Sequence, residues 1–177
     1  MMSRSTIEHK KKAPALLNFA VITISTSRYE KAMRMEAVED ESGELSAAML
    51  SAAGQKVVRT ALVSDNQGLI KKSLKKALDM PNVDAVITCG GTGITHTDVT
   101  IETINPLLEK ELPGFGELFR RFSYEEIGSA AIITRATAGL IKGKAVFCLP
   151  GSPQAVAMAL NRLIIPEVGH IIKHARE

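Results

Sequence analysis

Short runs of β-branched and other apolar residues alternate along this chain with longer segments of helical periodicity. The apolar runs predict buried β-strands at 18–25, 56–63, 83–90 and 144–150. The segments between and after them predict helices at 43–54, 66–80, 115–128 and 154–175, the last divided near Pro166. Residues 101–110 are expected to be helical at both ends, with Pro106 early in the helix or breaking it. Strands that alternate with helices favour an α/β fold, with a parallel or mostly parallel sheet covered on both faces.

The chain has the length of one compact domain, since 177 residues can bury a sizeable core but hardly two. Residues 1–15 are polar and charged, which predicts a flexible N-terminal arm before a single domain at 16–177. The HKKK run at 9–12 is interpreted as a solvated tail, with contact to an acidic partner as the alternative.

Composition excludes several classes of protein. Hydrophobic residues make up 45% and charged residues 23%, which excludes wholesale disorder. A net charge of +3 is too mild to indicate a nucleic-acid partner. No apolar run approaches the roughly 18 residues of a membrane span, and the N-terminus lacks the pattern of a signal peptide. The two cysteines, Cys89 and Cys148, end apolar runs, and this usage favours a cytoplasmic protein with reduced thiols.

The loop Gly90-Gly91-Thr92-Gly93 follows directly on the predicted strand at 83–90. Ligands of open α/β sheets collect at such strand ends, and glycine lets backbone N–H groups approach an anion closely. The loop therefore predicts a phosphate site, although a tight turn without a ligand remains the alternative. It is neither a phosphate-binding loop of the G-x-x-x-x-G-K-[ST] type nor a dinucleotide fingerprint, because no lysine follows and His96 occupies the position of the third glycine.

Asp98 lies five residues beyond the last glycine of this loop. A carboxylate beside a phosphate repels it unless a cation lies between them, and Mg²⁺ binds one or two carboxylates together with phosphate oxygens. The equally good alternative is that Asp98 caps the N-terminus of a helix beginning at Thr100.

Three long motifs carry a resemblance to a known family. GGTGITHTDVT, LPGFGELFRRFSYEEIGSAAIITRATAG and LPGSPQAVAMAL closely resemble segments of the MoaB/MogA family of molybdenum cofactor biosynthesis proteins. The resemblance extends from about Asn18 to Pro166, and FGELFRRFSYEEIG is similar to the MoaB branch in particular. It implies a three-layer α/β/α sandwich with a mostly parallel central sheet, assembled as a homotrimer or homohexamer. It also implies adenylylation of molybdopterin by Mg-ATP, giving adenylylated molybdopterin and pyrophosphate, with other proteins of the pathway as further partners and with neither nucleic acid nor membrane.

The resemblance also implies roles for individual residues. Asp65 and Asp98 match the two acidic positions of active members, which makes them the expected catalytic residues and Mg²⁺ ligands. Some MoaB relatives with another residue at the first position are thought not to catalyse adenylylation, so both aspartates together favour an active enzyme. The nucleotide phosphates are assigned to the glycine loop, namely Gly90, Gly91, Thr92 and Gly93. The residues expected to contact molybdopterin are Ser25, Asp40, Ser42, Gly43, Pro150, Gly151, Ser152 and Pro153.

Alternatives to these roles follow from the same residues. Asp40 could equally cap the helix behind it, and the stretch 150–153 could simply turn into a helix with Pro153 at its first position. The first loop, ISTSR, departs from the Ser-Asp-Arg type of sequence of MogA, which leaves the contacts of residues 25–28 open. A non-catalytic molybdopterin carrier is the alternative function, and it would not require two magnesium carboxylates.

The remaining candidate residues are interpreted as structural. His170 and His174 have a spacing that can bind zinc, but without an evident third ligand an exposed pair is the better interpretation. Cys89 is expected to be a buried, inert thiol. The lysines at 71, 72, 75 and 76 are expected to form the solvated face of a helix, with nucleic-acid contact a minor alternative.

Overall fold

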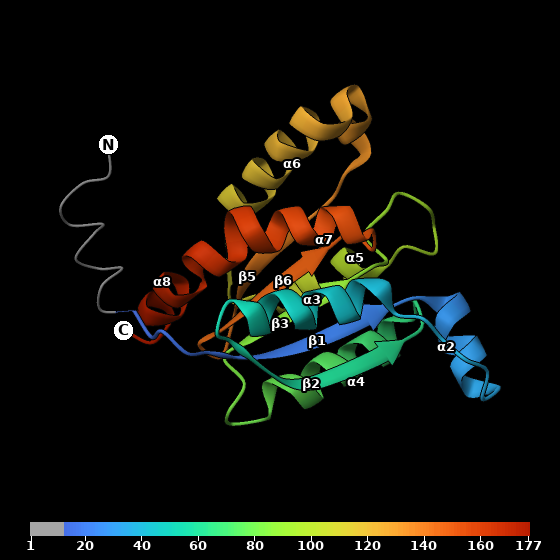
Figure 1. Cartoon of the computed structure of the whole chain (residues 1–177), viewed down its shortest axis with the longest axis horizontal. Helices are drawn as coiled ribbons and strands as arrows, with labels where there is room; N and C mark the ends of the chain where they lie inside the picture. Colours follow the sequence, from blue (N-terminus) through green and yellow to red (C-terminus); the bar gives the residue numbers. More distant parts are fainter. Residues whose placement is uncertain (1–12) are drawn as a thin grey trace.

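The structure, a computed structural model, describes residues 13–177 and contains one six-stranded sheet (Figure 1). The strands are ordered β2-β1-β3-β6-β5-β4 across the sheet. Four of them run parallel: β1 (Asn18–Ile24), β2 (Lys56–Val63), β3 (Ala85–Cys89) and β6 (Lys144–Leu149). The other two, β4 (Lys110–Glu111) and β5 (Thr137–Ile141), pair antiparallel at one edge. The predicted mostly parallel sheet is therefore confirmed.

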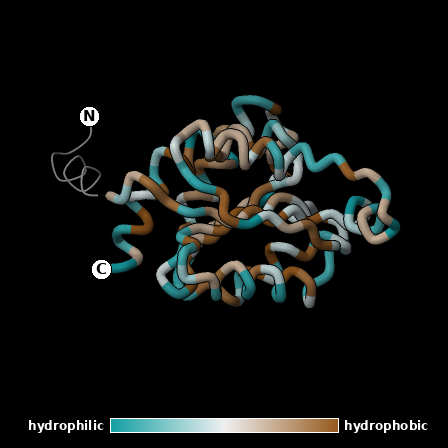
Figure 2. The backbone as a smooth tube through the Cα atoms, turned by 60° about the horizontal axis from the view of Figure 1, so that its bottom comes forward, coloured by the Kyte–Doolittle hydropathy of each residue, from teal (hydrophilic) through white to brown (hydrophobic). Residues whose placement is uncertain are grey.

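Helices cover both faces of the sheet, which gives the predicted three layers. One face carries α3 (Glu41–Ala52), α6 (Pro113–Ile127), α7 (Pro153–Ala159) and α8 (Ile165–Ala175). The other carries α4 (Gln67–Leu78) and α5 (Thr100–Ile104). Short 3₁₀ segments, η1 (Asn105–Leu107) and η2 (Gly128–Ile133), follow α5 and α6. Figure 2 shows many of the hydrophobic backbone segments running through the middle of the molecule.

The strand β1 shows why its sequence is an unbroken apolar run. Phe19 and Val21 point into the core cluster beneath α3 and α7, whereas Ala20, Ile22 and Ile24 point into the cluster beneath α4. Successive side chains of a strand alternate between the two faces, so a strand buried on both sides needs apolar residues at nearly every position. The same reasoning applies to β3, all five residues of which are buried.

Three elements differ from the sequence-based expectation. The hydrophilic connection after β1 contains the helix α2 (Thr26–Met33), which no apolar stripe signalled because none of its residues is buried. The end of the segment 101–110 is extended rather than helical, since Lys110 begins β4. The strand β5 was not predicted at all, and its hairpin to β6 turns through Lys142 and Gly143, both at positive φ, as in the tight type I′ turns that join antiparallel strands.

The C-terminal helical segment runs from Pro153 to Ala175 and, as predicted, consists of two α-helices divided near Pro166. A π-helical turn, η3 (Leu160–Ile164), joins α7 to α8 just before Pro166. Proline has no N–H to donate, and the widened turn accommodates the missing helical hydrogen bond. This segment is long and apolar enough to cross a membrane by length and composition, but a core helix passes the same test. Its residues Val156, Leu160 and Ile172 are fully buried in the core.

Replacing Phe147 by alanine should lower the free energy of unfolding by about 3–5 kcal/mol, because the ring is fully buried in β6 and a cavity would remain. Phe115 packs on it, with ring centroids 5.4 Å apart. Urea denaturation followed by circular dichroism measures the change. The control, Met33→Ala on the exposed helix α2, should stay within about 0.5 kcal/mol of the wild type. Equal losses in the two variants would contradict the assigned core.

Candidate functional site

The loops that leave the carboxyl ends of the parallel strands surround a cleft of about 460 Å³. Ser25 follows β1, Asp65 follows β2, the glycine loop follows β3, and Pro150 follows β6. Parallel strands place their carboxyl ends at one edge of a sheet, where α/β proteins bind ligands. The residues that line the cleft are Ile24, Ser25, Arg28, Asp65, Gly90, Gly91, Thr92, Gly93, Asp98, Ile133, Thr134, Arg135, Pro150 and Gly151.

Two glycines bring the backbone of the loop against the two predicted catalytic carboxylates. Gly91 has a φ of +62°, and a Cβ there would lie 2.5 Å from Oδ1 of Asp65. A Cβ at position 93 would lie 2.6 Å from Oδ2 of Asp98. Side chains at these positions would therefore displace the carboxylates, which explains why the loop needs glycine. The structure thus brings Asp65, from the loop after β2, to the loop after β3 that carries Gly91, Gly93 and Asp98.

Hydrogen bonds from Thr100 and Arg135 hold the glycine loop in place. Thr100, at the start of α5, donates its hydroxyl to the carbonyl of Gly90 (2.9 Å) and its N–H to the carbonyl of Gly91 (2.9 Å). The guanidinium of Arg135 donates to the carbonyls of Thr92 (2.8 Å) and Gly93 (2.6 Å). These contacts bind four successive carbonyls of the loop and fix its conformation.

Arg135 lines the cleft and was missed by the reasoning from single residues. Besides holding the loop, its guanidinium forms an ion pair with Glu102 of α5, at 2.5 Å between Nη1 and Oε1. Its signal in the sequence was only its place inside one of the long family motifs, because an isolated arginine between a 3₁₀ turn and a short strand has no recognisable spacing. Thr134 and Ile133 next to it also line the cleft and were likewise missed.

The prediction that Asp98 could cap the helix beginning at Thr100 is wrong. Among the described residues, the N-cap of α5 is Val99, and it makes no side-chain capping bond. Asp98 instead closes a turn of its own loop, where Oδ2 accepts the N–H (2.9 Å) and the hydroxyl (2.6 Å) of Thr95. Partial burial raises the pKa of Asp98, but hydrogen bonds from Thr95 and Gly93 and the charge of Arg135 outweigh it. The net effect is a pKa below the usual range, which keeps the carboxylate charged.

Asp65 is oriented by Thr26, the first residue of α2. Oδ2 accepts both the N–H and the hydroxyl of Thr26 at 2.9 Å, and the N–H of Asp65 donates to that same hydroxyl at 3.1 Å. Oδ1 is left on the side of Gly91. Thr26 lies in the ISTSR stretch whose contacts the sequence left open, and its part in the site follows only from the structure.

The other residues of that stretch shape the entrance of the cleft. Ser25 caps α2 by accepting the N–H of Arg28 at 3.5 Å, and both residues line the cleft. Arg28 and Arg135 thus bring two cations to a cleft that also holds two carboxylates.

Three of the residues expected to contact molybdopterin, Asp40, Ser42 and Gly43, are not among those that line the cleft. Asp40 caps α3 through the N–H of Gly43 (3.1 Å) and accepts the hydroxyl of Thr23 (2.6 Å), as its alternative interpretation predicted. Ser42 is fully buried and donates to the carbonyl of Gly151 at 2.6 Å. Ser42 thus supports Gly151 of the cleft wall, and contact of these three residues with molybdopterin stays a prediction.

The stretch from Pro150 to Pro153 forms both a wall and a helix start. Pro150 and Gly151 line the cleft. The exposed Ser152 caps α7 by accepting the N–H of Ala155 at 3.3 Å, and Pro153 opens that helix. The turn that the sequence predicted here is confirmed, and it lies at the edge of the site.

The expectation that Cys89 is inert is consistent with its environment. Burial raises the pKa of the thiols of Cys89 and Cys148 to about 12, so neither forms a nucleophilic thiolate at neutral pH. The HKKK run and residues 1–12 of the predicted arm lie outside the described residues.

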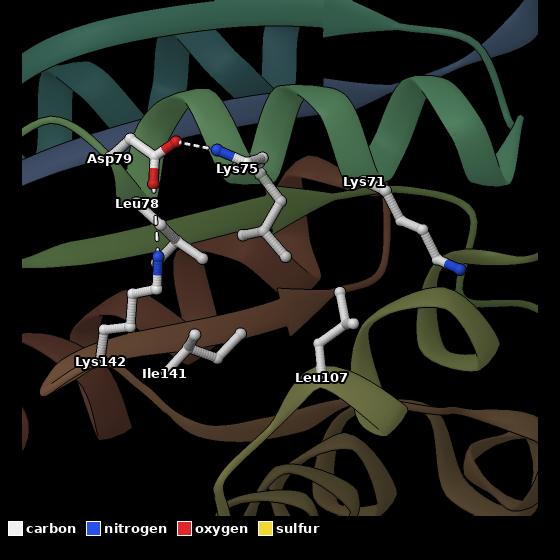
Figure 3. Close-up of a pocket in the computed structure, with 8 residues that line it drawn as sticks. Lys71, Lys75, Leu78, Asp79, Leu107, Ile141 and Lys142 are labelled. Atoms are coloured by element: carbon white, nitrogen blue, oxygen red, sulfur yellow. Dashed lines mark hydrogen bonds and ion pairs between the residues drawn. The ribbon is translucent and has the colours of Figure 1, made fainter.

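A second cavity, of about 330 Å³, lies beside α4 and contains none of the predicted site residues (Figure 3). Leu78, Leu107 and Ile141 form an apolar floor. At its rim Asp79 binds Lys75 and, at 3.4 Å, Lys142. The cavity offers no grouping of carboxylates with a glycine loop, so the chemistry is assigned to the cleft at the strand ends.

Residues 20–170 match the family described as "Probable molybdopterin binding domain". The chain belongs to this family. The resemblance to MoaB/MogA proteins that the motifs indicated is therefore confirmed.

Family members with curated names are similar over nearly their whole length. The molybdenum cofactor biosynthesis protein B of Bacillus subtilis is 45% identical over 174 residues, 98% of this chain and 98% of that protein. The molybdopterin adenylyltransferase of Pyrococcus furiosus is 48% identical over 174 residues, 96% of this chain and 98% of that protein. The crystal structure of the tungsten cofactor synthesizing protein MoaB from Pyrococcus furiosus matches with a TM-score of 0.82 and 46% identity, covering 93% of this chain and 100% of that one.

The lowered pKa of Asp98 predicts how its contribution to stability depends on pH. A carboxyl whose pKa is lower in the folded state stabilises the fold above its unfolded pKa of about 3.9. That stabilisation is lost as the pH falls through the folded value. The difference in free energy of unfolding between wild type and Asp98→Asn should therefore be largest near neutral pH and shrink below pH of about 4. Urea denaturation at several pH values measures it, and a constant difference would contradict the assigned hydrogen bonds.

Proposed function

We propose that the chain is a molybdopterin adenylyltransferase of molybdenum cofactor biosynthesis, acting in the cytoplasm. It would transfer the adenylyl group of ATP to the terminal phosphate of molybdopterin and release pyrophosphate. The observation that carries the proposal is the approach of Asp65 and Asp98, from separate loops, to one glycine loop in one cleft. The name of the Pyrococcus furiosus relative, which is 48% identical, supports this reaction, and the name of the Bacillus subtilis relative supports the pathway.

The chemistry requires positioning and charge neutralisation rather than a proton acceptor. An oxygen of the molybdopterin phosphate attacks the α-phosphorus, a new P–O bond forms, and the bond to pyrophosphate breaks. The attacking phosphate is already an anion near neutral pH, so the chain needs no general base. What accelerates such a reaction is in-line alignment and stabilisation of the negative charge that develops on the leaving group.

The cleft supplies groups for both tasks. The backbone of Gly90–Gly93 can approach phosphate oxygens without hindrance from a Cβ, and Arg28 and Arg135 add positive charge. Ser25 and the turn at Pro150 and Gly151 would border the molybdopterin.

The two carboxylates fit Mg²⁺ in their number and chemistry. The described residues contain no group of three or more histidine, cysteine or acidic side chains that could enclose a metal. Mg²⁺ does not need one, since it binds one or two carboxylates and completes its octahedron with phosphate oxygens and water. Asp65 and Asp98 would hold it, and the ion would neutralise charge on the leaving pyrophosphate.

We further propose that the protein acts as a homotrimer or homohexamer. Exposed apolar side chains gather on α6 and η2, the part of the chain that rises above α7 in Figure 1. They are Leu118, Tyr124, Ile127, Ile132 and Ile133. Large exposed apolar patches commonly mark protein interfaces. Sedimentation equilibrium of the pure protein would measure the assembly.

Replacing Asp65 or Asp98 by asparagine should lower turnover by roughly 10²-fold or more, the scale of losing one preorganised electrostatic group. The assay measures pyrophosphate release from Mg-ATP with fresh molybdopterin. Both variants should fold, because neither aspartate lies in the core clusters.

The matched control is Asp79→Asn, the same chemical change on an exposed aspartate at the end of α4. It should leave turnover unchanged. Near-normal turnover of Asp65→Asn or Asp98→Asn would remove that residue from the mechanism. Tight molybdopterin binding by the wild type without pyrophosphate release would instead identify a carrier.

Arg135→Met should lower kcat/KM by at least about tenfold, because hydrogen bonds from a charged donor contribute about 1.5–3 kcal/mol and the loop would lose several of them. Steady-state kinetics with varied ATP measure the loss. Arg162→Met is the control, since that guanidinium stacks on Phe122 at 3.5 Å, outside the cleft lining. Unchanged kinetics in Arg135→Met would show that the loop keeps its conformation without this side chain.

A further inference from the structure

The helix α8 and the two residues that follow it carry a symmetric pattern of titratable residues in the stretch EVGHIIKHARE, with Glu177 beyond the end of the helix. Glu167 precedes His170 by three residues, His174 follows four residues later, and Glu177 follows after three more. Side chains three or four residues apart lie on the same face of a helix. The four groups therefore form one row, which the proposed adenylyl transfer does not use.

The row has a defined geometry. Nε2 of His170 and Nε2 of His174 face each other at 3.0 Å, with the ring planes at 64°. Nδ1 of His170 lies 3.4 Å from Oε2 of Glu167, and Nδ1 of His174 lies 3.0 Å from Oε2 of Glu177. The outer nitrogen of each ring thus meets a carboxylate, and the inner nitrogens meet each other.

This arrangement determines what the inner nitrogens can do. A neutral imidazole has one N–H and one nitrogen with a lone pair. If each Nδ1–H donates to its carboxylate, both Nε2 atoms present lone pairs to the same point. Two lone pairs at this separation repel each other unless a cation bridges them, either a proton in an N–H···N hydrogen bond or a metal ion bound by both nitrogens. Histidines that bind metals have this same support, an outer N–H donated to a carboxylate that fixes the tautomer and strengthens the ligand.

The separation of the two nitrogens also fits a metal. Zn–N bonds of about 2.0–2.1 Å at angles between 90° and tetrahedral place two nitrogens roughly 2.9–3.4 Å apart. The side chain of His170 is 25% exposed and that of His174 is 46% exposed, so an ion can reach the pair from solvent. Nζ of Lys173 lies 3.5 Å from Oε1 of Glu177. The other carboxylate oxygen, Oε2, faces Nδ1 of His174, so the lysine and the histidine contact different oxygens of Glu177.

We propose that His170 and His174, backed by Glu167 and Glu177, form a bidentate site for Zn²⁺ or another divalent cation that prefers imidazole, with the remaining positions taken by water. Ni²⁺ and Cu²⁺ share that preference. The site is separate from the cleft, because about 20 residues of helix, roughly 30 Å, lie between Ser152 and the histidines. It stands whether or not the proposed adenylyl transfer is correct.

The test is a zinc titration of the full chain without a histidine tag, in competition with a chromophoric chelator. One equivalent of zinc per chain is expected. His170→Ala and His174→Ala should each abolish competition, since a single imidazole remains. His96→Ala, which removes an exposed histidine elsewhere, should bind zinc like the wild type.

The carboxylates distinguish a built site from a chance pair of surface histidines. Glu167→Gln and Glu177→Gln should each weaken zinc binding by about 10–100-fold, as outer-shell changes do at metal sites. Circular dichroism of every variant checks that α8 remains folded. No zinc bound by the wild type, undiminished binding in the alanine variants, or full affinity in both glutamine variants would overturn the proposal.

Discussion

The parallel hydrogen bonding of β1 to β3 and of β3 to β6 holds the central strands in one direction, and the rest of the structure depends on it. Val21 pairs with Ile87, and Ile87 pairs with Phe147, all of them buried. Because the strands share a direction, the loops after β1, β3 and β6 leave the sheet side by side, joined by the loop after β2. The apolar cores on both faces make any other register costly, since a shift of one residue would reverse every side chain.

At the carboxyl ends of the strands, the positions of the charged side chains depend on how closely they can approach the backbone of the glycine loop. The glycines at 91 and 93 let two carboxylates approach the same loop, and a Cβ at either place would push one of them away. Arg135 donates hydrogen bonds to carbonyls of the loop, and its positive charge offsets the negative charge of the two carboxylates. The cleft is thus a preorganised set of opposite charges, which suits a substrate rich in phosphate.

The C-terminal helical segment extends from the edge of the cleft to the proposed metal site. It begins at Pro153, just after Pro150 and Gly151 of the cleft wall, and its last turns carry the pair of histidines. Between them Val156, Leu160 and Ile172 fill the core, which fixes the orientation of the segment against the sheet. The exposed row on α8 is therefore held on a rigid element, which favours a defined distance between its two rings.

Much of this was determined by the sequence alone, because strand propensity, helical periodicity and glycine conformation are local properties. The strand 56–63, the α4 helix and the glycine loop were all predicted, and the long motifs indicated the family. Asp98 was singled out by its position just beyond the glycine loop, and Asp65 by its match to that family. Short or solvent-exposed elements such as α2 and β4 were missed, since they bury too little to leave a pattern.

Only the tertiary structure decided which side chains meet. It placed Thr26 on Asp65 and Arg135 on the glycine loop, and it moved Asp98 from a helix cap to a turn with Thr95. It also placed Ser42 on Gly151 of the cleft wall. These contacts join residues from different loops, or depend on the path of one loop, and strand pairing and packing set those distances. No local pattern in the sequence encodes them.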